Sequence, residues 1–147
     1  MKQLNSTQNA LFLTGGALMV IGAGCFAFLL MQNIACWVYL IGSVMFAGIQ
    51  ASQTYNGNNP TISRLKRIMT LADCCFVVAG LLMVDNVYML LRSAFANVFT
   101  YYEYVFNKWV IVLLIAALLE VYTMHRISSE LAKEEKAVID ADTEPEA

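Results

Sequence analysis

The stretch that decides the fold is RLKRIMTLADCCFVVAGLLMVD, residues 64–85. Three basic residues, Arg64, Lys66 and Arg67, lead directly into an apolar run that is long enough to enter a lipid bilayer. The run contains a carboxylate, Asp73, and acidic side chains are costly and rare inside hydrocarbon. The stretch therefore predicts a transmembrane helix that begins in a basic cluster and carries an acid within it.

The composition of the whole chain agrees with this prediction. Of 147 residues, 59% are hydrophobic and 14% are charged, whereas soluble domains carry about 25% charged residues. We therefore expect an all-α integral membrane protein whose transmembrane domain covers residues 1–126. Residues 127–147 hold seven acidic and two basic side chains, which predicts an acidic cytoplasmic tail. The tail is expected to be helical to residue 136 and disordered from residue 137, and the chain is not expected to bind nucleic acid.

Four apolar segments, at about residues 10–31, 34–51, 66–87 and 108–125, are each long enough for one span. A tight turn at residues 32–33 predicts that the first two spans form an antiparallel hairpin, and the last two are expected to form a second. Asn59 followed by Pro60 is typical of a helix start. Residues 88–109 contain eight aromatic side chains, which predicts a partly helical segment that lies in the membrane interface. Asp85 is expected at the outer interface.

The basic residues predict which side of the membrane each connection occupies. With four spans, one side receives seven Lys and Arg residues and the other side receives two, Arg92 and Lys108. The cluster that determines this topology comprises Arg64, Lys66, Arg67 and Arg126. By the positive-inside rule, both termini are cytoplasmic. We expect a multi-pass protein of the bacterial inner membrane.

Small side chains recur at helical spacing in the first two spans. The two stripes are Gly16, Ala23 and Ala27 in the first span and Ser43, Ala47 and Ala51 in the second. Small residues allow helix backbones to approach closely in lipid. The stripes therefore predict the faces through which these two helices pack.

Two acids are predicted to lie within the hydrocarbon. Asp73 follows Arg67 by six residues, and Glu120 precedes Arg126 by six, so each lies ~9 Å along its helix from a basic residue. Neither acid has a basic residue three or four positions away, where a helix would supply a partner. Three interpretations remain open: a structural hydrogen bond or an ion pair with Lys66, Arg67 or Arg126, a contact with a partner protein, or a site that holds a proton or a cation.

The remaining candidates for chemistry in the sequence are the four cysteines and the single histidine. The four cysteines are interpreted as packing residues, with thiol–disulfide exchange between Cys25 and Cys36 as the alternative. His125 has no ligand spacing with another residue, and no metal, cofactor or enzymatic activity is expected. The sequence favours a non-catalytic accessory or structural subunit that acts through a membrane-protein partner or as a homo-oligomer. The alternative function is an oligomeric proton- or cation-linked small transporter that uses Asp73 and Glu120.

Overall fold

The computed structural model describes residues 5–53 and 55–143, and every regular element in this part of the chain is a helix. The long helices are α1 (Ser6–Ala27), α2 (Gln32–Ser52), α3 (Pro60–Tyr88) and α5 (Trp109–Thr143). The 3-10 helix η1 (Leu90–Ala94) and the short helix α4 (Val98–Tyr104) connect α3 to α5. Four helical stretches are long and apolar enough to cross a membrane. The prediction of an all-α chain with four such helices is confirmed.

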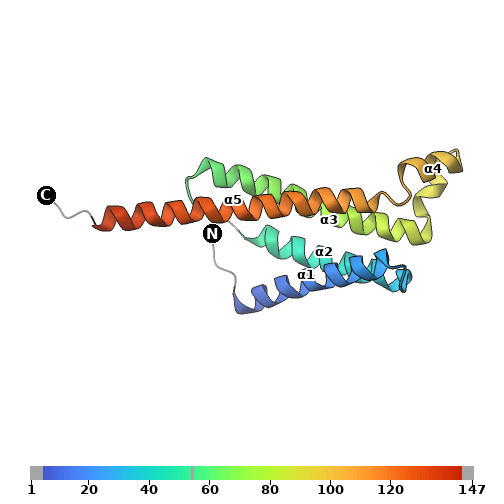
Figure 1. The fold of residues 1–147 in the computed structure, drawn as a ribbon, viewed down its shortest axis with the longest axis horizontal. Coiled ribbons are helices and arrows are strands. Elements are labelled where there is room, and N and C mark those ends of the chain that lie inside the picture. Colours follow the sequence, from blue (N-terminus) through green and yellow to red (C-terminus); the bar gives the residue numbers. More distant parts are fainter. Residues whose placement is uncertain (1–4, 54, 144–147) are drawn as a thin grey trace.

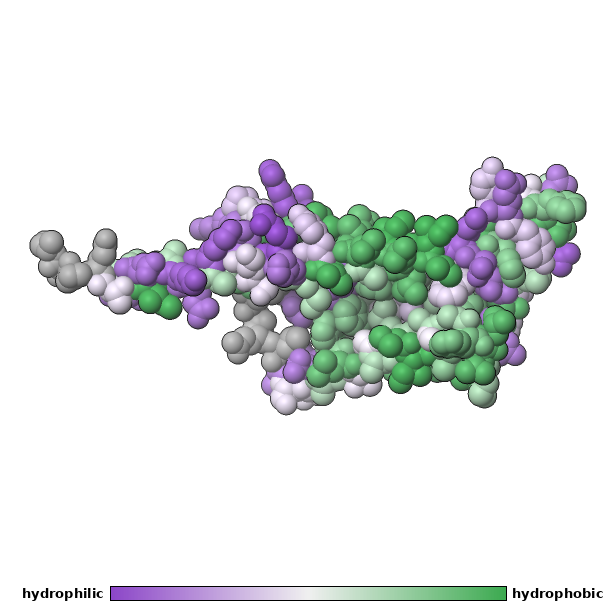
Figure 2. All heavy atoms as spheres, viewed as in Figure 1, coloured by the Kyte–Doolittle hydropathy of each residue, from purple (hydrophilic) through white to green (hydrophobic). Residues whose placement is uncertain are grey.

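The long helices lie side by side, so the molecule has two distinct ends (Figure 1). We call the end at which α2 stops, α3 starts and α5 projects the tail end, and the end that holds residues 28–31 and 89–108 the aromatic end. Between them, the surface in Figure 2 is largely hydrophobic, and hydrophilic residues gather toward the two ends. Large apolar side chains on the outer faces, such as Leu13, Leu71 and Leu118, are exposed.

The helix starts and ends have local causes. The Asn59 side chain accepts a hydrogen bond from the Thr61 amide at 3.0 Å, so α3 begins at Pro60, as predicted. The first connection lies at residues 28–31 instead of 32–33. Leu29 adopts a left-handed conformation with φ of 59°, and the Leu30 amide donates to the Cys25 carbonyl at 2.9 Å. This hydrogen-bond pattern is a Schellman motif, which satisfies the last carbonyls of α1 and ends the helix.

Helix α5 continues far beyond the predicted fourth span. Residues 137–143, which the sequence predicted to be disordered, are helical instead, and residues 144–147 lie outside the described part of the chain. The strong helix formers Ala, Glu and Lys are concentrated in residues 127–136, which the sequence predicted to be helical, and the helix continues from them through residue 143. Lys133 also pairs with Glu130 one turn earlier, at 2.9 Å, which supports the helix. High charge alone therefore did not prevent helix formation here.

The contact between α1 and α2 uses a different face of α1 from the predicted one. A Cβ atom added at Gly22 would lie 2.8 Å from the backbone nitrogen of Tyr39, closer than real Cβ contacts come. The buried face of α1 comprises Gly15, Met19, Gly22 and Phe26. Each residue along a helix is turned by about 100° from the last, so the predicted stripe lies to one side of this face, where a Cβ added at Gly16 would meet the Phe46 ring at 3.8 Å. In the predicted stripe, Gly16 and Ala23 are half-buried and Ala27 is exposed.

The matching face of α2 also differs from its prediction. Gly42 lies against α1, where an added Cβ would meet the Gly15 carbonyl oxygen at 2.8 Å. In the predicted stripe, Ser43 is buried, Ala47 is half-buried and Ala51 is exposed. The close approach of the two helices therefore depends on glycines that the stripe of small residues did not include.

The buried apolar side chains form two separate clusters. The larger cluster lies toward the aromatic end and includes Tyr39, Phe76 and Ala116. The smaller cluster lies toward the tail end and consists of Leu65, Met69 and Ile127. On α3 and α5, Asp73 and Glu120 fall between residues of the two clusters. A buried polar layer thus interrupts the hydrophobic core.

Candidate functional site

The polar layer brings together three side chains from three helices. Gln50 of α2, Asp73 of α3 and Glu120 of α5 are only 2%, 4% and 6% exposed. The carboxylates of Asp73 and Glu120 are close enough to interact electrostatically. The sequence predicted that these two acids lie at a similar depth, and the packing of α3 on α5 brings them together.

Gln50 is the member of this layer that the sequence analysis missed. Its Nε2 atom donates a hydrogen bond to Oε1 of Glu120 at 2.5 Å. Three oxygens are left buried without a partner in the described part of the chain: Gln50 Oε1, Asp73 Oδ1 and Glu120 Oε2. Buried polar atoms are nearly always hydrogen-bonded. Three unpartnered oxygens in one layer are an exception to this rule, and the layer has more hydrogen-bond acceptors than donors.

The basic residues do not remove this excess of acceptors. In the described part of the chain, the ion pairs join Glu130 to Arg126 at 3.7 Å and to Lys133 at 2.9 Å. Arg64 and Arg67 are exposed. Lys66 is half-buried two turns before Asp73 and attracts it over a longer range. The predicted ion pair between a buried acid and Lys66, Arg67 or Arg126 is thus not formed among the described residues.

The buried hydroxyl groups of the same helices have other acceptors. The Thr123 hydroxyl donates to the Leu119 carbonyl at 2.8 Å, and the Ser43 hydroxyl donates to the Leu40 carbonyl at 2.8 Å. The Tyr39 hydroxyl donates to the carbonyl of Phe76 at 3.2 Å. These groups satisfy the backbone, so they do not supply donors to the three unpartnered oxygens.

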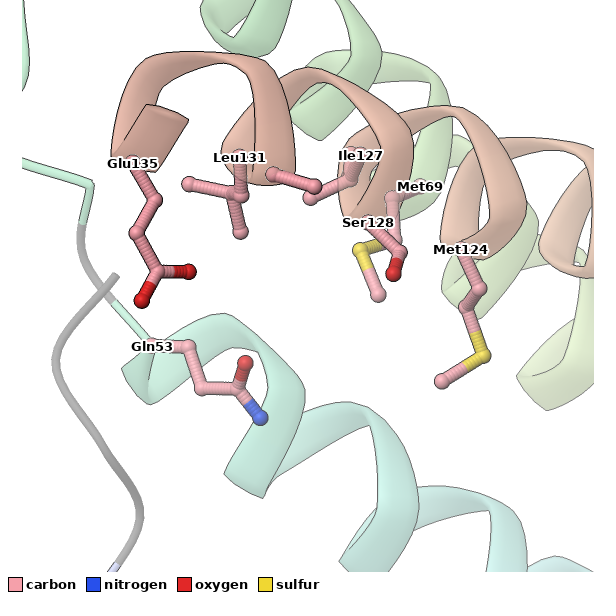
Figure 3. Close-up of a pocket in the computed structure, with 8 residues that line it drawn as sticks. Gln53, Met69, Met124, Ile127, Ser128, Leu131 and Glu135 are labelled. Carbon is pink, nitrogen blue, oxygen red and sulfur yellow. The ribbon is translucent and has the colours of Figure 1, made fainter. Parts of the chain in front are cut away.

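An open cavity of about 420 Å³ lies on the tail-end side of the polar layer. Figure 3 shows the side chains that line it. Its lining comes from α3, α5 and the C-terminal end of α2: Gln53, Met69, Met124, Ile127, Ser128, Leu131, Ala132 and Glu135. Gln53, Met69 and Met124 each stand one helix turn toward the tail end from a member of the layer. We call this cavity the vestibule. In Figure 3, Gln53 and Glu135 stand at one end of it and Met124 at the other.

A second hollow runs between α1 and α5. It has a volume of about 410 Å³, and its lining is apolar: Gly16, Met19, Val20, Ala23, Tyr39, Phe46, Phe76, Leu113 and Ala117. Toward the aromatic end, the rings of Phe26 and Trp109 meet edge to face with centroids 5.1 Å apart. We call this hollow the apolar groove. Two residues of the predicted packing stripe, Gly16 and Ala23, line it.

Asp85, which was expected at the outer interface, lies near the aromatic end of α3, and its side chain is buried, at 3% exposure. Its carboxylate accepts hydrogen bonds from the Tyr101 hydroxyl at 2.7 Å and from the Leu91 amide at 2.6 Å. Burial, together with the hydrogen bond to Asp85, raises the pKa of Tyr101 to about 12, so the phenol keeps its proton and remains a donor. This carboxylate fastens η1 and α4 to the end of α3.

The remaining candidates do not form a site. Cys25 is half-buried and Cys36 is buried, and both are free thiols. His125 is exposed. Within the described residues, no group of three or more His, Cys, Asp and Glu side chains could hold a metal ion.

The geometry defines a class of protein: an all-helical chain with four helices long and apolar enough to cross a membrane, and with a buried polar layer across three of them. No protein-family model, curated protein or solved structure matches the chain. The function must therefore be argued from the residues themselves.

Proposed function

We propose that the chain is a polytopic membrane protein with four transmembrane helices in two antiparallel hairpins, α1 with α2 and α3 with α5. The support is the band of exposed apolar side chains between two hydrophilic ends, because lipid solvates such a surface and water does not. Arg64, Lys66 and Arg67 lie in the tail-end half of α3, and Arg126 follows the predicted fourth span on the tail-end side of Glu120. The positive-inside rule then assigns the tail end to the cytoplasm of a bacterial cell. The aromatic residues of α4 suit the opposite interface.

In this membrane, we propose, the protein acts as a non-catalytic accessory subunit that binds a transmembrane helix of a partner protein. The observation that carries the proposal is the apolar groove. Small side chains, Gly16, Ala23 and Ala117, contribute to its lining. Such residues let another helix approach closely, and close approach is what drives helix association in lipid. The groove therefore fits a partner helix with a smooth apolar face.

Purification in mild detergent tests this proposal when it is combined with variants that fill the groove. The wild-type chain is expected to retain a stoichiometric membrane partner. Ala23→Leu is expected to lose this partner, because the larger side chain occupies the space of the incoming helix. Gly48→Leu is the matched control, since Gly48 is exposed and has open space around it. Equal retention of the partner by both variants would refute the groove as the binding surface.

A second candidate function is proton- or cation-linked transport by a homo-oligomer. The observation that favours it is the set of unpartnered oxygens on Gln50, Asp73 and Glu120. Acidic residues buried within membrane-spanning helices commonly mark ion pathways. A homo-oligomer that purifies without any partner, and that moves protons or cations across vesicle membranes, would favour this candidate over the accessory role.

A further inference from the structure

The polar layer is short of hydrogen-bond donors, and this shortage points to a specific ligand. Two carboxylates and one amide leave three oxygens unpartnered while each residue is more than nine-tenths buried. The nearby hydroxyls donate to backbone carbonyls. Among the groups that face the layer, α2 contributes Gln50, α5 contributes Glu120, and α3 contributes Asp73 with Lys66 further along the helix. The missing donors can be supplied by a proton on one of the acids, by water that enters from the adjacent cavity, or by a bound ion.

A metal ion fits this layer poorly. Calcium takes about 6–8 oxygen ligands, and magnesium demands a near-octahedral set. Three unpartnered oxygens fall short of either. A proton requires one carboxylate oxygen to receive it and one neighbouring acceptor, and the layer supplies both.

Gln50 can serve the layer in both protonation states. An amide carries a donor and an acceptor on the same group. When Glu120 is ionised, Nε2 of Gln50 donates to it, as the structure has it. When Glu120 is protonated, a turn of the amide lets the free Oε1 atom accept the new O–H. Gln50 is thus a positioning residue for a carboxyl group that gains and loses a proton.

The vestibule supplies a route for that proton. It reaches to within one helix turn of the polar layer on each of the three helices. Its inner lining includes Met69 and Met124, and unbranched thioether chains rearrange easily. On the opposite side of the layer lie the larger hydrophobic cluster, with Tyr39, Phe76 and Ala116, and the apolar groove, whose lining carries no charged side chain. Access is therefore one-sided, from the tail end.

We propose that Asp73, Glu120 and Gln50 form a proton-binding site that exchanges protons with the aqueous phase through the vestibule at the tail end. The step is simple acid–base chemistry: a carboxylate oxygen gains a proton from water in the vestibule and later returns it. Because the two acids interact, they share the titration and ionise in two macroscopic steps. This site is independent of the proposed binding of a partner helix in the groove.

Infrared titration of the purified chain in phosphatidylcholine vesicles tests the proposal. We expect the titration of the carboxylic-acid C=O band of the wild type to include two steps that belong to the buried pair. Asp73→Asn and Glu120→Gln should each remove one step. Asp140→Asn, at an exposed acid on α5, is the matched control and should leave both steps. Gln50→Leu should shift the frequency of the band, because the carboxyl group loses its amide partner.

The route is tested by blocking the vestibule. With the four native cysteines replaced by serine, a maleimide on Gln53→Cys should slow hydrogen–deuterium exchange of the carboxyl band. The same label on Thr143→Cys, at the exposed end of α5, should not slow the exchange. A carboxyl titration that both Asp73→Asn and Glu120→Gln leave unchanged overturns the proposal, because the titrating groups would then lie elsewhere. Loss of intensity of the carboxylic-acid C=O band when sodium ions are added at constant pH would also overturn the proposal, because a metal cation would then compete with the proton for the site.

The purification tests the partner-binding groove and the infrared titration tests the proton site, so the result of one does not decide the other. Loss of the partner in the Ala23→Leu purification concerns only the groove, whereas the carboxyl titration uses the chain alone. A chain that titrates but binds no partner keeps the proton site and loses the accessory role. A chain that binds its partner but does not titrate keeps the accessory role and loses the proton site.

Discussion

Replacing Gly22 by alanine tests the close contact between α1 and α2. The added methyl group would lie 2.8 Å from the backbone nitrogen of Tyr39 and 2.9 Å from its Cα and Cβ atoms. Carbon atoms in favourable contact are about 3.5–4.0 Å apart. The nearest atoms belong mostly to the backbone of α2, so no side-chain rotation relieves the clash. The two helices must therefore move apart locally by roughly 0.5–1 Å.

The energetic cost follows from this separation. A gap of about 0.5–1 Å forfeits a quarter to a half of the dispersion energy of the atoms that face it. Inserting a methyl group into a well-packed contact typically costs about 1–3 kcal/mol. The alanine also gains roughly 0.5–1 kcal/mol of helix propensity over glycine. Gly48→Ala has the same gain without the clash, because nothing lies within 4 Å of an added Cβ there.

The measurement is the free energy of unfolding of both variants and the wild type in the same mixed micelles. The propensity term cancels between the two variants, so Gly22→Ala should be less stable than Gly48→Ala by about 1–3 kcal/mol. Gly48→Ala should be at least as stable as the wild type. If Gly22→Ala is as stable as Gly48→Ala, the two helices are not packed through Gly22, and the assigned face of α1 is wrong.

Three further predictions concern the ends of the molecule. In cells, cysteine at position 57 should be labelled only from the cytoplasm and cysteine at position 97 only from outside; labelling of position 57 from outside contradicts the four-span topology. Tyr101→Phe should lower the free energy of unfolding by about 1–3 kcal/mol, because a buried carboxylate loses a donor, whereas Tyr104→Phe, at an exposed ring, should have little effect. A hydrogen bond from a neighbouring lysine lowers the pKa of Glu130. Ionised Glu130 therefore stabilises α5 at pH values above the unfolded-state pKa near 4.3, and this stabilisation is lost as the pH falls through the lower folded-state pKa. Glu130→Gln removes the titrating group, so helicity measured by circular dichroism should fall less on acidification than in the wild type.

Local properties of the chain were sufficient to predict the helices. Length and continuous apolarity mark four long helices, and the Asn59–Pro60 pair marks the start of α3, because capping depends only on adjacent residues. The depth of Asp73 and Glu120 followed from counting residues along a helix of known rise. The helix was predicted as far as residue 136, but its continuation over residues 137–143 was not, since the acidic composition at this end of the sequence predicted disorder.

Contacts between helices could not be predicted in the same way. A shift of one residue turns a side chain by about 100°, so a stripe of small residues does not specify which of two neighbouring faces is buried. Helix α1 buries Gly15 and Gly22 in the contact, and not Gly16 and Ala23, because of the way it packs against Tyr39 and Gly42 of α2.

The sequence by itself determined that the chain is helical, where its apolar helices run and which acids lie within them, because these are properties of consecutive residues. Only the tertiary structure decided that Gln50 bonds Glu120, that Asp85 is buried under Tyr101 and that a vestibule reaches the polar layer. The two hydrogen bonds join residues 70 and 16 positions apart, and the vestibule is lined by residues from 53 to 135. Such pairs are brought together by the crossing and rotation of whole helices, which no local pattern records.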